Sequence, residues 1–276
     1  MKFNTKSGFM SLSLLFVCLF SYSLDVFSKT IIISDIDDTI KKANSAGKFP
    51  AEMYHFLKKV PYIEMRDLFN EIESNEQSKS EQVAFYYVSA AQKITFNAQK
   101  WLLHYNFPPG QSVLRTLKKR NSTYDFKHAA IKKILEAEIK TLDQSSNEPL
   151  HVMMFGDNSQ ADAVVYSDLT NEMNLDSKIY IRDVKAEATR FDSSIPVLKI
   201  PGVIYYFSEV ELFQNPEFDY LSADLKKRTY RSYLNKELIP QYTFKTLYRR
   251  LNTFYHDKNR SHEDAVKFWD EYYSRF

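Results

Sequence analysis

The sequence predicts an α/β protein built around a parallel sheet that helices cover on both faces. Short apolar runs rich in β-branched residues alternate along the chain with longer segments of helical periodicity. Polar and acidic residues follow several of these runs directly, which is typical of strand ends in open α/β sheets. Glycine is scarce, with 5 residues in 276, so long flexible linkers between separate domains are not expected.

The first part of the chain supplies two strands and their connection. Residues 29–35 predict a strand that ends in a group of carboxylates, and residues 83–88 predict the second strand. The segment 51–74 has helical periodicity, and Pro61 divides it into two helices. We expect the span 51–82 to form a small helical insertion or a minimal cap.

The next segments continue the alternation of helices and strands. The expected elements are a helix over 93–104, a short strand or extended segment over 111–118, a helix over 126–141, a strand over 150–155, a helix over 160–173 and a strand over 178–182. Together with the earlier strands, they define one domain over 29–205.

The last 70 or so residues differ in composition. Residues 206–276 are dense in Tyr, Phe, Lys and Arg, and many aromatic residues recur at helical spacing. We expect a helical extension whose aromatic stripes pack on the α/β core. The alternative is an amphipathic surface for a membrane or a partner, because aromatic and basic side chains together suit an interface.

The N-terminus has the pattern of a secretory signal. Two lysines precede an apolar stretch over 9–22, and Ser21/Ser23 and Val26/Ser28 offer the residue spacing of a cleavage site. The stretch is short for a membrane span, although an uncleaved anchor is the alternative. Cys18, the only cysteine, lies in this segment, so a cleaved chain would carry no thiol. We expect residues 1–28 to be a signal peptide and the protein to be secreted or periplasmic in a bacterium.

Three aspartates follow the first predicted strand. Asp35, Asp37 and Asp38 cannot stay buried and charged without a partner. Clustered carboxylates suit a divalent cation, and Mg²⁺ prefers a few carboxylates together with water and substrate oxygens. Asp157, which follows the strand over 150–155, could supply another ligand. The expected cofactor is therefore Mg²⁺.

The same region has the groups that phosphoryl transfer requires, which are a nucleophile, a proton shuttle, positive charge and a metal. Asp35 could attack and form an aspartyl-phosphate. Asp37 lies two residues further on, so it points to the same side of an extended backbone and could protonate the leaving oxygen. Ser89 and Lys127 could hold the phosphoryl oxygens, the lysine as a point charge.

Ordinary structural roles stay open for several of these residues. Ser89 could cap a helix, Lys127 could be an exposed helix lysine, and Asp162 could be an acid in the first turn of a helix. Asp38 is expected to order the turn after the first strand. Asn158 and Gln160 are expected to orient the metal-binding aspartate.

Six short strings occur in a characteristic order and spacing. They are ISDIDDTIK at 33–41, YYVSA at 86–90, FPPG at 107–110, KxxxIxxIL at 127–135, GDNSQAD at 156–162 and IYIRDV at 179–184. Together they resemble the haloacid dehalogenase-like (HAD) phosphohydrolase superfamily, and most closely the catalytic domain of the actin-patch-associated phosphatidate phosphatases. The resemblance covers about residues 30–200. The chain departs from the family at Ala91-Gln92, where Ser-Pro is common.

The resemblance implies a Rossmann-like (HAD-type) sheet and a Mg²⁺-dependent phosphomonoesterase. It implies that Asp35 is the nucleophile and a metal ligand, and that Asp37 is the acid/base. Asp157 is implied as a metal ligand, with the main-chain carbonyl of Asp37 as a second contact. Asp162 is implied as a further ligand or as a carboxylate just outside the ligands.

The expected substrate is a large phosphate ester. The spans on either side of Ser89 leave room for a small cap at most, and an open site suits phosphatidate or another lipid phosphate, reached at a membrane surface. Nucleotides or phosphoproteins are the alternative, and a non-catalytic binding protein on the same fold is a third reading. No nucleic-acid partner is expected, because the net charge is only +2.

Overall fold

The structure, a computed structural model, describes most of the chain between residues 29 and 234. The described residues are 29–43, 59–79, 81–94, 96–116, 122–142, 150–159, 161–184, 199–206 and 208–234. The predicted signal peptide, residues 51–58 of the predicted insertion and residues 235–276 of the predicted extension lie outside them. None of the described helices is both long and apolar enough to cross a membrane.

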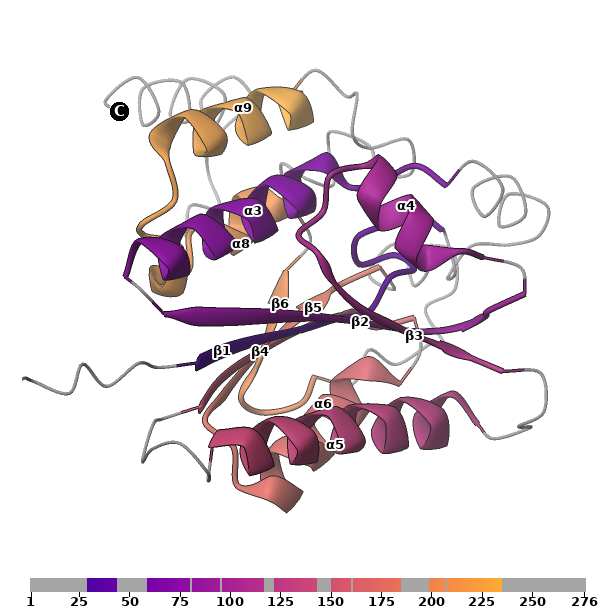
Figure 1. The fold of residues 1–276 in the computed structure, drawn as a ribbon. Coiled ribbons are helices and arrows are strands. Elements are labelled where there is room, and N and C mark those ends of the chain that lie inside the picture. The colour runs from indigo at the N-terminus through magenta and orange to yellow at the C-terminus, as the bar shows by residue number, and fades with distance from the viewer. Residues whose placement is uncertain are drawn as a thin grey trace, which may run out of the picture.

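A six-stranded parallel sheet forms the centre of the molecule (Figure 1). Its strands are β1 (Lys29–Ser34), β2 (Gln82–Gln92), β3 (Gly110–Arg115), β4 (Leu150–Asp157), β5 (Ser177–Arg182) and β6 (Val203–Tyr206). The strand order is β3-β2-β1-β4-β5-β6, so the chain reverses its direction of travel across the sheet between β1 and β4. Ligands of such sheets bind at the carboxyl ends of the strands beside this reversal.

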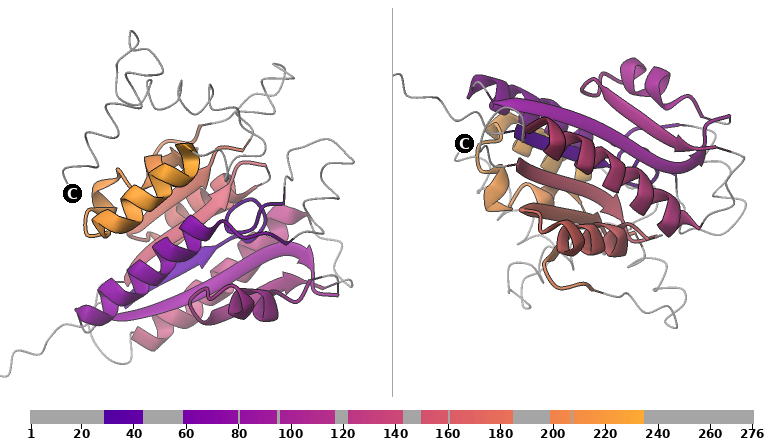
Figure 2. Two further views of the ribbon diagram at one scale, coloured as in Figure 1. Left: turned by 90° about the horizontal axis from the view of Figure 1, so that it is seen from above. Right: turned by 60° about the horizontal axis from the view of Figure 1, so that its bottom comes forward.

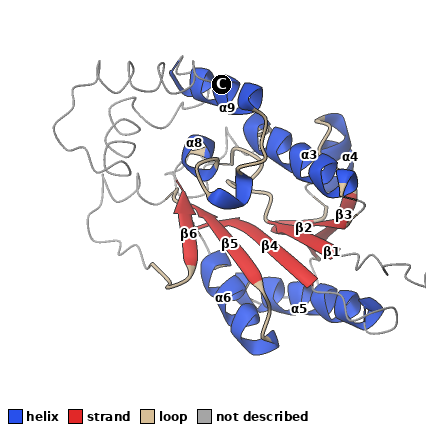
Figure 3. Cartoon of the chain, turned by 90° about the vertical axis from the view of Figure 1, so that its left-hand side faces the viewer, coloured by secondary structure: helices blue, strands red, loops and turns tan. Residues whose placement is uncertain are grey.

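Helices cover both faces of the sheet, which makes three layers (Figure 3). The helices are α3 (Ile63–Ser78), α4 (Ala98–His104), α5 (Thr123–Leu142), α6 (Asp162–Met173), α8 (Glu209–Leu212) and α9 (Ala223–Leu234), with a 3₁₀ turn over Pro216–Phe218. One layer holds α5 and α6, and the other holds α3, α4, α8 and α9. The predicted α/β, Rossmann-like class is therefore confirmed.

The core explains why β1 reads as a continuous apolar run. Ile31, Ile32 and Ile33 are fully buried, and successive side chains point to opposite faces of the sheet. Ile32 therefore joins the cluster beneath α3 and α4, whereas Ile31 and Ile33 join the cluster beneath α5 and α6. A strand that is buried on both faces needs apolar residues at every position.

Two described regions differ from the sequence prediction. β6 was not predicted, and it carries the sheet beyond β5, so the division at residues 205/206 falls inside a strand. Beyond β6, Phe213, Phe218 and Leu225 lie in the same buried cluster as the residues beneath α3. β6 has only four residues, which is too short for a clear periodic signal.

The predicted insertion also differs in its described part. α3 begins shortly after Pro61 and connects β1 to β2, with its apolar residues buried on the sheet. This part is a crossover helix and does not form a cap. The helix expected over 93–104 begins at Ala98, because β2 continues to Gln92 and the Asn97 side chain accepts a hydrogen bond from the Lys100 backbone N–H at 3.0 Å.

Gly110 allows β3 to approach β2 closely. A Cβ atom at this position would lie 2.4 Å from the carbonyl oxygen of Phe85, which is backbone and cannot rotate away. We expect Gly110→Ala to lower the free energy of unfolding by about 1–3 kcal/mol, measured by urea denaturation. Gln111→Ala, at the exposed neighbouring position, is the control and should change it by less than about 0.5 kcal/mol. Equal changes in the two variants would contradict the close approach.

Candidate active site

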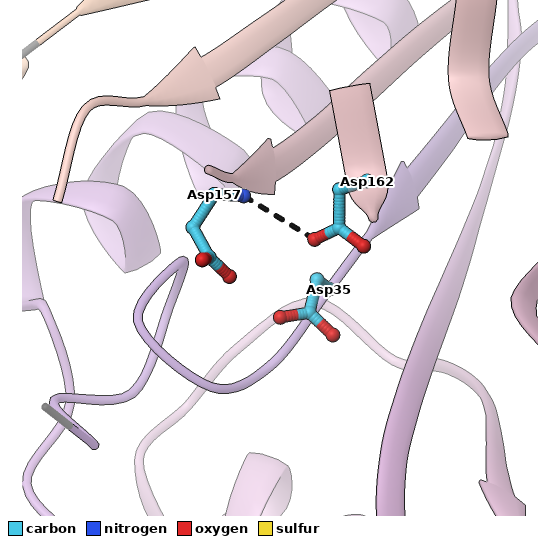
Figure 4. A group of neighbouring side chains, drawn as sticks. All are labelled: Asp35, Asp157 and Asp162. Atoms are coloured by element: carbon cyan, nitrogen blue, oxygen red, sulfur yellow. Dashed lines mark hydrogen bonds between the residues drawn. The ribbon is translucent and has the colours of Figure 1, made fainter. Parts of the chain in front are cut away.

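Three aspartates converge at the carboxyl edge of the sheet, beside the reversal between β1 and β4 (Figure 4). Asp35 follows β1 directly, Asp157 is the last residue of β4, and Asp162 is the first residue of α6. One carboxylate oxygen of each lies within 4.8 Å of the others. All three side chains are buried. The structure thus brings together three residues that the sequence predicted as metal ligands.

Backbone contacts fix this arrangement. The Asp35 N–H donates to the Phe155 carbonyl at 2.8 Å, and the Asp157 N–H donates to Asp162 Oδ2 at 3.3 Å (Figure 4). Gly156 makes the second contact possible, because a Cβ atom there would lie 2.7 Å from the Cβ of Asp162. The glycine of the GDNSQAD string is therefore needed for the close approach of β4 to α6.

Lys127 lies between two of these aspartates. Its ammonium group donates to Asp35 Oδ1 at 2.8 Å and also forms an ion pair with Asp162 Oδ1. The side chain is only 2% exposed, so the alternative of an exposed helix lysine is wrong. Burial lowers the pKa of Lys127, but the carboxylates of Asp162 and Asp35 outweigh burial and raise this pKa above its ordinary value. The lysine is therefore a fixed positive charge.

The group carries more negative charge than one lysine balances. Burial raises the pKa of Asp35 well above its ordinary value, although Lys127 acts in the opposite direction. Burial and the neighbouring Asp162 raise the pKa of Asp157 to about 7. Both shifts have the same physical origin, because burial and crowded carboxylates disfavour the charged form.

A divalent cation fits this group of residues. Oδ2 of Asp35 and Oδ2 of Asp157 accept no hydrogen bond from the described residues, although both side chains are buried. Two such oxygens and a surplus of negative charge match the preference of hard divalent cations. Both oxygens of Asp162 already have partners, namely Lys127 and the Asp157 N–H. These contacts support a role for Asp162 in holding the lysine and the end of β4.

The side chain of Asp37 faces a different set of partners. Its Oδ2 accepts a hydrogen bond from Ser89 Oγ at 3.2 Å, and its Oδ1 forms an ion pair with Lys41. The Asp37 side chain is 17% exposed, whereas those of Asp35 and Lys127 are buried. Asp37 therefore lies at the solvent side of the site, where a leaving group would depart.

Asp38 orders the turn between these residues, as the sequence predicted. Its backbone has φ of +58°, its N–H donates to the Lys41 carbonyl at 2.7 Å, and its Oδ1 accepts from the Ala43 N–H at 2.9 Å. Aspartate tolerates the left-handed conformation better than most residues, because its short polar side chain bonds locally to the backbone. The turn brings Lys41 back to Asp37.

Lys41 is the functional candidate that sequence reasoning missed. Its side chain is 1% exposed, pairs with Asp37 and lies 4.9 Å above the centre of the Phe96 ring. The ISDIDDTIK string contained the residue, but a lysine after a predicted strand normally reads as a solvated side chain. Only the turn at Asp38 shows that the lysine folds back into the site.

Ser89 lies inside β2, where the pairing of β2 with β3 becomes irregular between Ser89 and Gln92. Its Oγ accepts from the Ala91 N–H at 3.0 Å and donates to Asp37. The helix-cap alternative is wrong, because Asn97 caps α4. The hydroxyl therefore lies at the site, next to Asp37.

The residues after Asp157 orient it through the backbone. The Ser159 N–H donates to Asp157 Oδ1 at 2.6 Å. The side chain of Asn158 donates to Asp183 Oδ1 at 2.7 Å, which links the residue after β4 to the residue after β5. Gln160 lies outside the described residues.

The role of Gly156 can be tested by cation binding. We expect Gly156→Ala to weaken Mg²⁺ binding about tenfold in calorimetric titrations, because the new methyl group displaces Asp162 from Asp157. Gly110→Ala is the matched control, since it strains the sheet away from the aspartates. Loss of Mg²⁺ binding in both variants would show that general instability, and not the local contact, is responsible.

The raised pKa of Asp157 predicts a pH dependence of stability. The ordinary pKa of this carboxyl is 3.8 and the folded one is about 7, so the folded state holds the extra proton between these values. Its contribution to the free energy of unfolding therefore falls as pH rises from about 4 to 7. We expect Mg²⁺ to remove this fall, because a bound cation favours the charged carboxylate.

Urea denaturation across this pH range, with EDTA or with Mg²⁺, measures the effect. Asp157→Asn is the control, and it should show a smaller fall and a smaller response to Mg²⁺ than the parent chain, because only the contribution of Asp35, whose pKa is also raised, then remains at this group. An unchanged slope on adding Mg²⁺ to the parent chain would contradict the assignment of a cation to this group.

Comparison with known proteins identifies a family that matches the part of the chain that forms this site. A protein-family model described as phosphatidate phosphatase APP1, catalytic domain, matches residues 30–183, which is more than half of the chain. The match spans β1 to the end of β5 and includes every site residue described above. No curated protein matches the chain.

Proposed function

This chain belongs to the family of the phosphatidate phosphatase APP1 catalytic domain, and from that membership we propose that it is a Mg²⁺-dependent phosphomonoesterase for phosphatidate or another lipid phosphate. The family establishes a phosphatase domain. The metal, the covalent route through Asp35, the preference for lipid and the export of the protein are our proposals. Export rests on the N-terminal basic and apolar pattern over residues 1–28.

The observation that carries the proposal is the position of Lys127. A buried lysine between Asp35 and Asp162 fixes the position of the Asp35 carboxyl group, with one oxygen outside the lysine contact. A phosphoryl group that reaches Asp35 would also meet the ammonium group of Lys127 and the hydroxyl group of Ser89. Such fixed charges stabilise the negative charge that develops during phosphoryl transfer.

In the first step, Asp35 attacks the phosphorus atom of the substrate. A bond forms between a carboxylate oxygen of Asp35 and phosphorus, and the bond from phosphorus to the leaving oxygen breaks. Asp37 transfers a proton to that leaving oxygen, and the product is an alcohol such as diacylglycerol. Lys41 and Ser89 hold Asp37 toward the reacting atoms.

In the second step, water attacks the phosphorus atom of the aspartyl-phosphate. Asp37, now unprotonated, takes a proton from this water, phosphate leaves, and Asp35 is regenerated. Mg²⁺ held by Asp35 and Asp157 would supply positive charge to the phosphoryl oxygens. Lys127 remains protonated throughout, because its two carboxylate partners raise its pKa.

The central test compares lipid and soluble substrates. We expect the chain to release phosphate from dispersed phosphatidate with Mg²⁺ and to stop when EDTA is added. Asp35→Asn should lower kcat by at least about 10³-fold, because the amide cannot form the covalent intermediate. Asp176→Asn, an exposed substitution beyond α6, is the matched control and should keep full activity.

Each failure of this test has a distinct meaning. Rapid hydrolysis of soluble phosphomonoesters without hydrolysis of phosphatidate would overturn the lipid assignment and would favour nucleotides or phosphoproteins. Hydrolysis that survives Asp35→Asn would overturn the covalent route. A chain that hydrolyses no phosphomonoester at all would be a binding protein on a phosphatase fold.

A further inference from the structure

One long segment of the chain carries no acidic residue. Between Glu81 and Asp125 the sequence has neither Asp nor Glu, although the whole chain holds 35 of them. Its basic residues are Lys93, Lys100, Arg115, Lys118, Lys119 and Arg120. The chain therefore contains a strongly basic segment, although its overall net charge is only +2.

The described part of this segment lies toward one edge of the sheet. It includes β2, α4 and β3, and β3 is the edge strand. α4 packs beside β3 at this edge (Figure 2). Of the segment's basic residues, Lys93, Lys100 and Arg115 lie in the described part, at or near this edge of the sheet.

The same side exposes the two most accessible large apolar side chains among the described residues. Ile94, in the loop after β2, is 75% exposed, and Leu103, on α4, is 63% exposed. Trp101 and Leu102 lie on the opposite, core-facing side of α4 and are buried. Leu103 and Lys100 are three residues apart on the helix, so they share its exposed face.

A neighbouring turn adds a further basic and apolar pair. The Trp101 indole N–H donates to the Lys59 carbonyl at 2.7 Å, which places Lys59 and Val60 against α4. Val60 is partly exposed. We call the set Lys59, Val60, Lys93, Ile94, Lys100 and Leu103 the docking face. Its three lysines are exposed, and none forms an ion pair with a described residue.

The docking face is linked to the site through Phe96, because the ammonium group of Lys59 lies 5.9 Å from the centre of the Phe96 ring. Asp37 pairs with Lys41, and Lys41 lies over the ring of Phe96. Phe96 in turn packs edge-on against Trp101 with ring centres 5.9 Å apart. A surface that binds the docking face would therefore lie beside the solvent-exposed side of Asp37.

We propose that the docking face binds an anionic lipid bilayer, with Ile94 and Leu103 inserted among the headgroups and the lysines at the phosphate level. The inference rests on the lipid substrate of the proposed function, and it identifies the surface that meets the bilayer. Single exposed apolar side chains among lysines suit a membrane interface. There, burial of the apolar side chains and attraction of the lysines to anionic lipids both favour binding.

Other partners fit this surface less well. A nucleic acid or another soluble polyanion would use the lysines, but it would gain little from the exposed side chains of Ile94 and Leu103. A stable protein partner normally buries a contiguous apolar core, whereas here the apolar side chains stand apart between basic ones. The bilayer uses both features at once.

A tryptophan probe tests insertion at a named position. We expect Ile94→Trp to add a component of tryptophan emission that shifts to the blue on vesicles of phosphatidylglycerol and phosphatidylcholine, and that brominated acyl chains quench. Neither lipid is a phosphomonoester, so no turnover occurs. Val164→Trp, on α6 in the opposite helix layer, is the control, and the emission of Trp101 and Trp269 in the parent chain is subtracted. Equal quenching at the two positions would overturn the proposal.

Kinetic variants test whether docking serves the site. Ile94→Ser with Leu103→Ser should lower the rate on phosphatidate in vesicles about tenfold. Lys93→Gln with Lys100→Gln should lower the rate on phosphatidate in vesicles about fivefold per lysine. This effect should become smaller at high salt, because salt screens the charges. Neither pair should change the rate on monomeric short-chain phosphatidate. Lys133→Gln with Lys140→Gln, on α5, is the charge-matched control and should leave both rates unchanged.

The outcomes separate this inference from the proposed function. Loss of vesicle activity in the lysine pair alone, with the apolar pair unaffected, would overturn bilayer insertion and would indicate a soluble polyanion or charge attraction only. Equal loss on monomeric and vesicle substrate would indicate damage to the site, which would also overturn the assignment. If the parent chain hydrolysed no phosphatidate in either form, the proposed function would fail, while the tryptophan probe would still report whether the bilayer is bound.

Discussion

The buried ammonium group of Lys127 is the interaction on which the rest of the site depends. It comes from the middle of the chain, on α5, yet it bonds to Asp35 after β1 and to Asp162 on α6. Removing one partner of such a group would leave an uncompensated buried charge, which typically costs about 3–5 kcal/mol. The contact therefore joins the two halves of the parallel sheet across the reversal between β1 and β4. A stable sheet and a preorganised nucleophile are consequences of the same ion pairs.

The charge balance explains why this arrangement suits catalysis better than stability. Three carboxylates surround one lysine, and burial raises the pKa of Asp157 to about 7 instead of allowing full ionisation. A chain selected for stability alone would replace such a group by apolar residues, because buried ion pairs seldom repay their desolvation. The surplus negative charge is a reason for a cation to bind, and it would bind at the two oxygens that accept no hydrogen bond from the described residues. The repulsion between these carboxylates is concentrated at the edge of the sheet where the reaction is proposed to occur.

The sequence predicted most of the sheet because β1, β2, β4 and β5 contain apolar runs followed by polar residues. It also predicted the grouping of Asp35 and Asp157, since both follow parallel strands and such strand ends share one edge. It missed β6 because four residues carry no usable periodicity. It missed Lys41 because the residue depends on a left-handed turn at Asp38, which is a backbone property that residue type only weakly indicates. The described part of the predicted insertion proved to be a crossover helix, since α3 begins at Ile63 and buries its apolar face on the sheet.

The Asp38 turn also explains why the site and the docking face belong together. The turn folds Lys41 back to Asp37, and the stem of that lysine needs an apolar and aromatic surface in place of water. The ring of Phe96 supplies this surface, and Phe96 packs against Trp101 of α4. α4 therefore packs close to the Asp37–Lys41 pair through Phe96 and Trp101, and Lys100 and Leu103 lie on its exposed face. An acid-free segment at this position adds no negative charge that would repel an approaching phosphate ester. The packing that fixes the proton carrier thus also places a basic and apolar surface at the side where a lipid phosphate would enter.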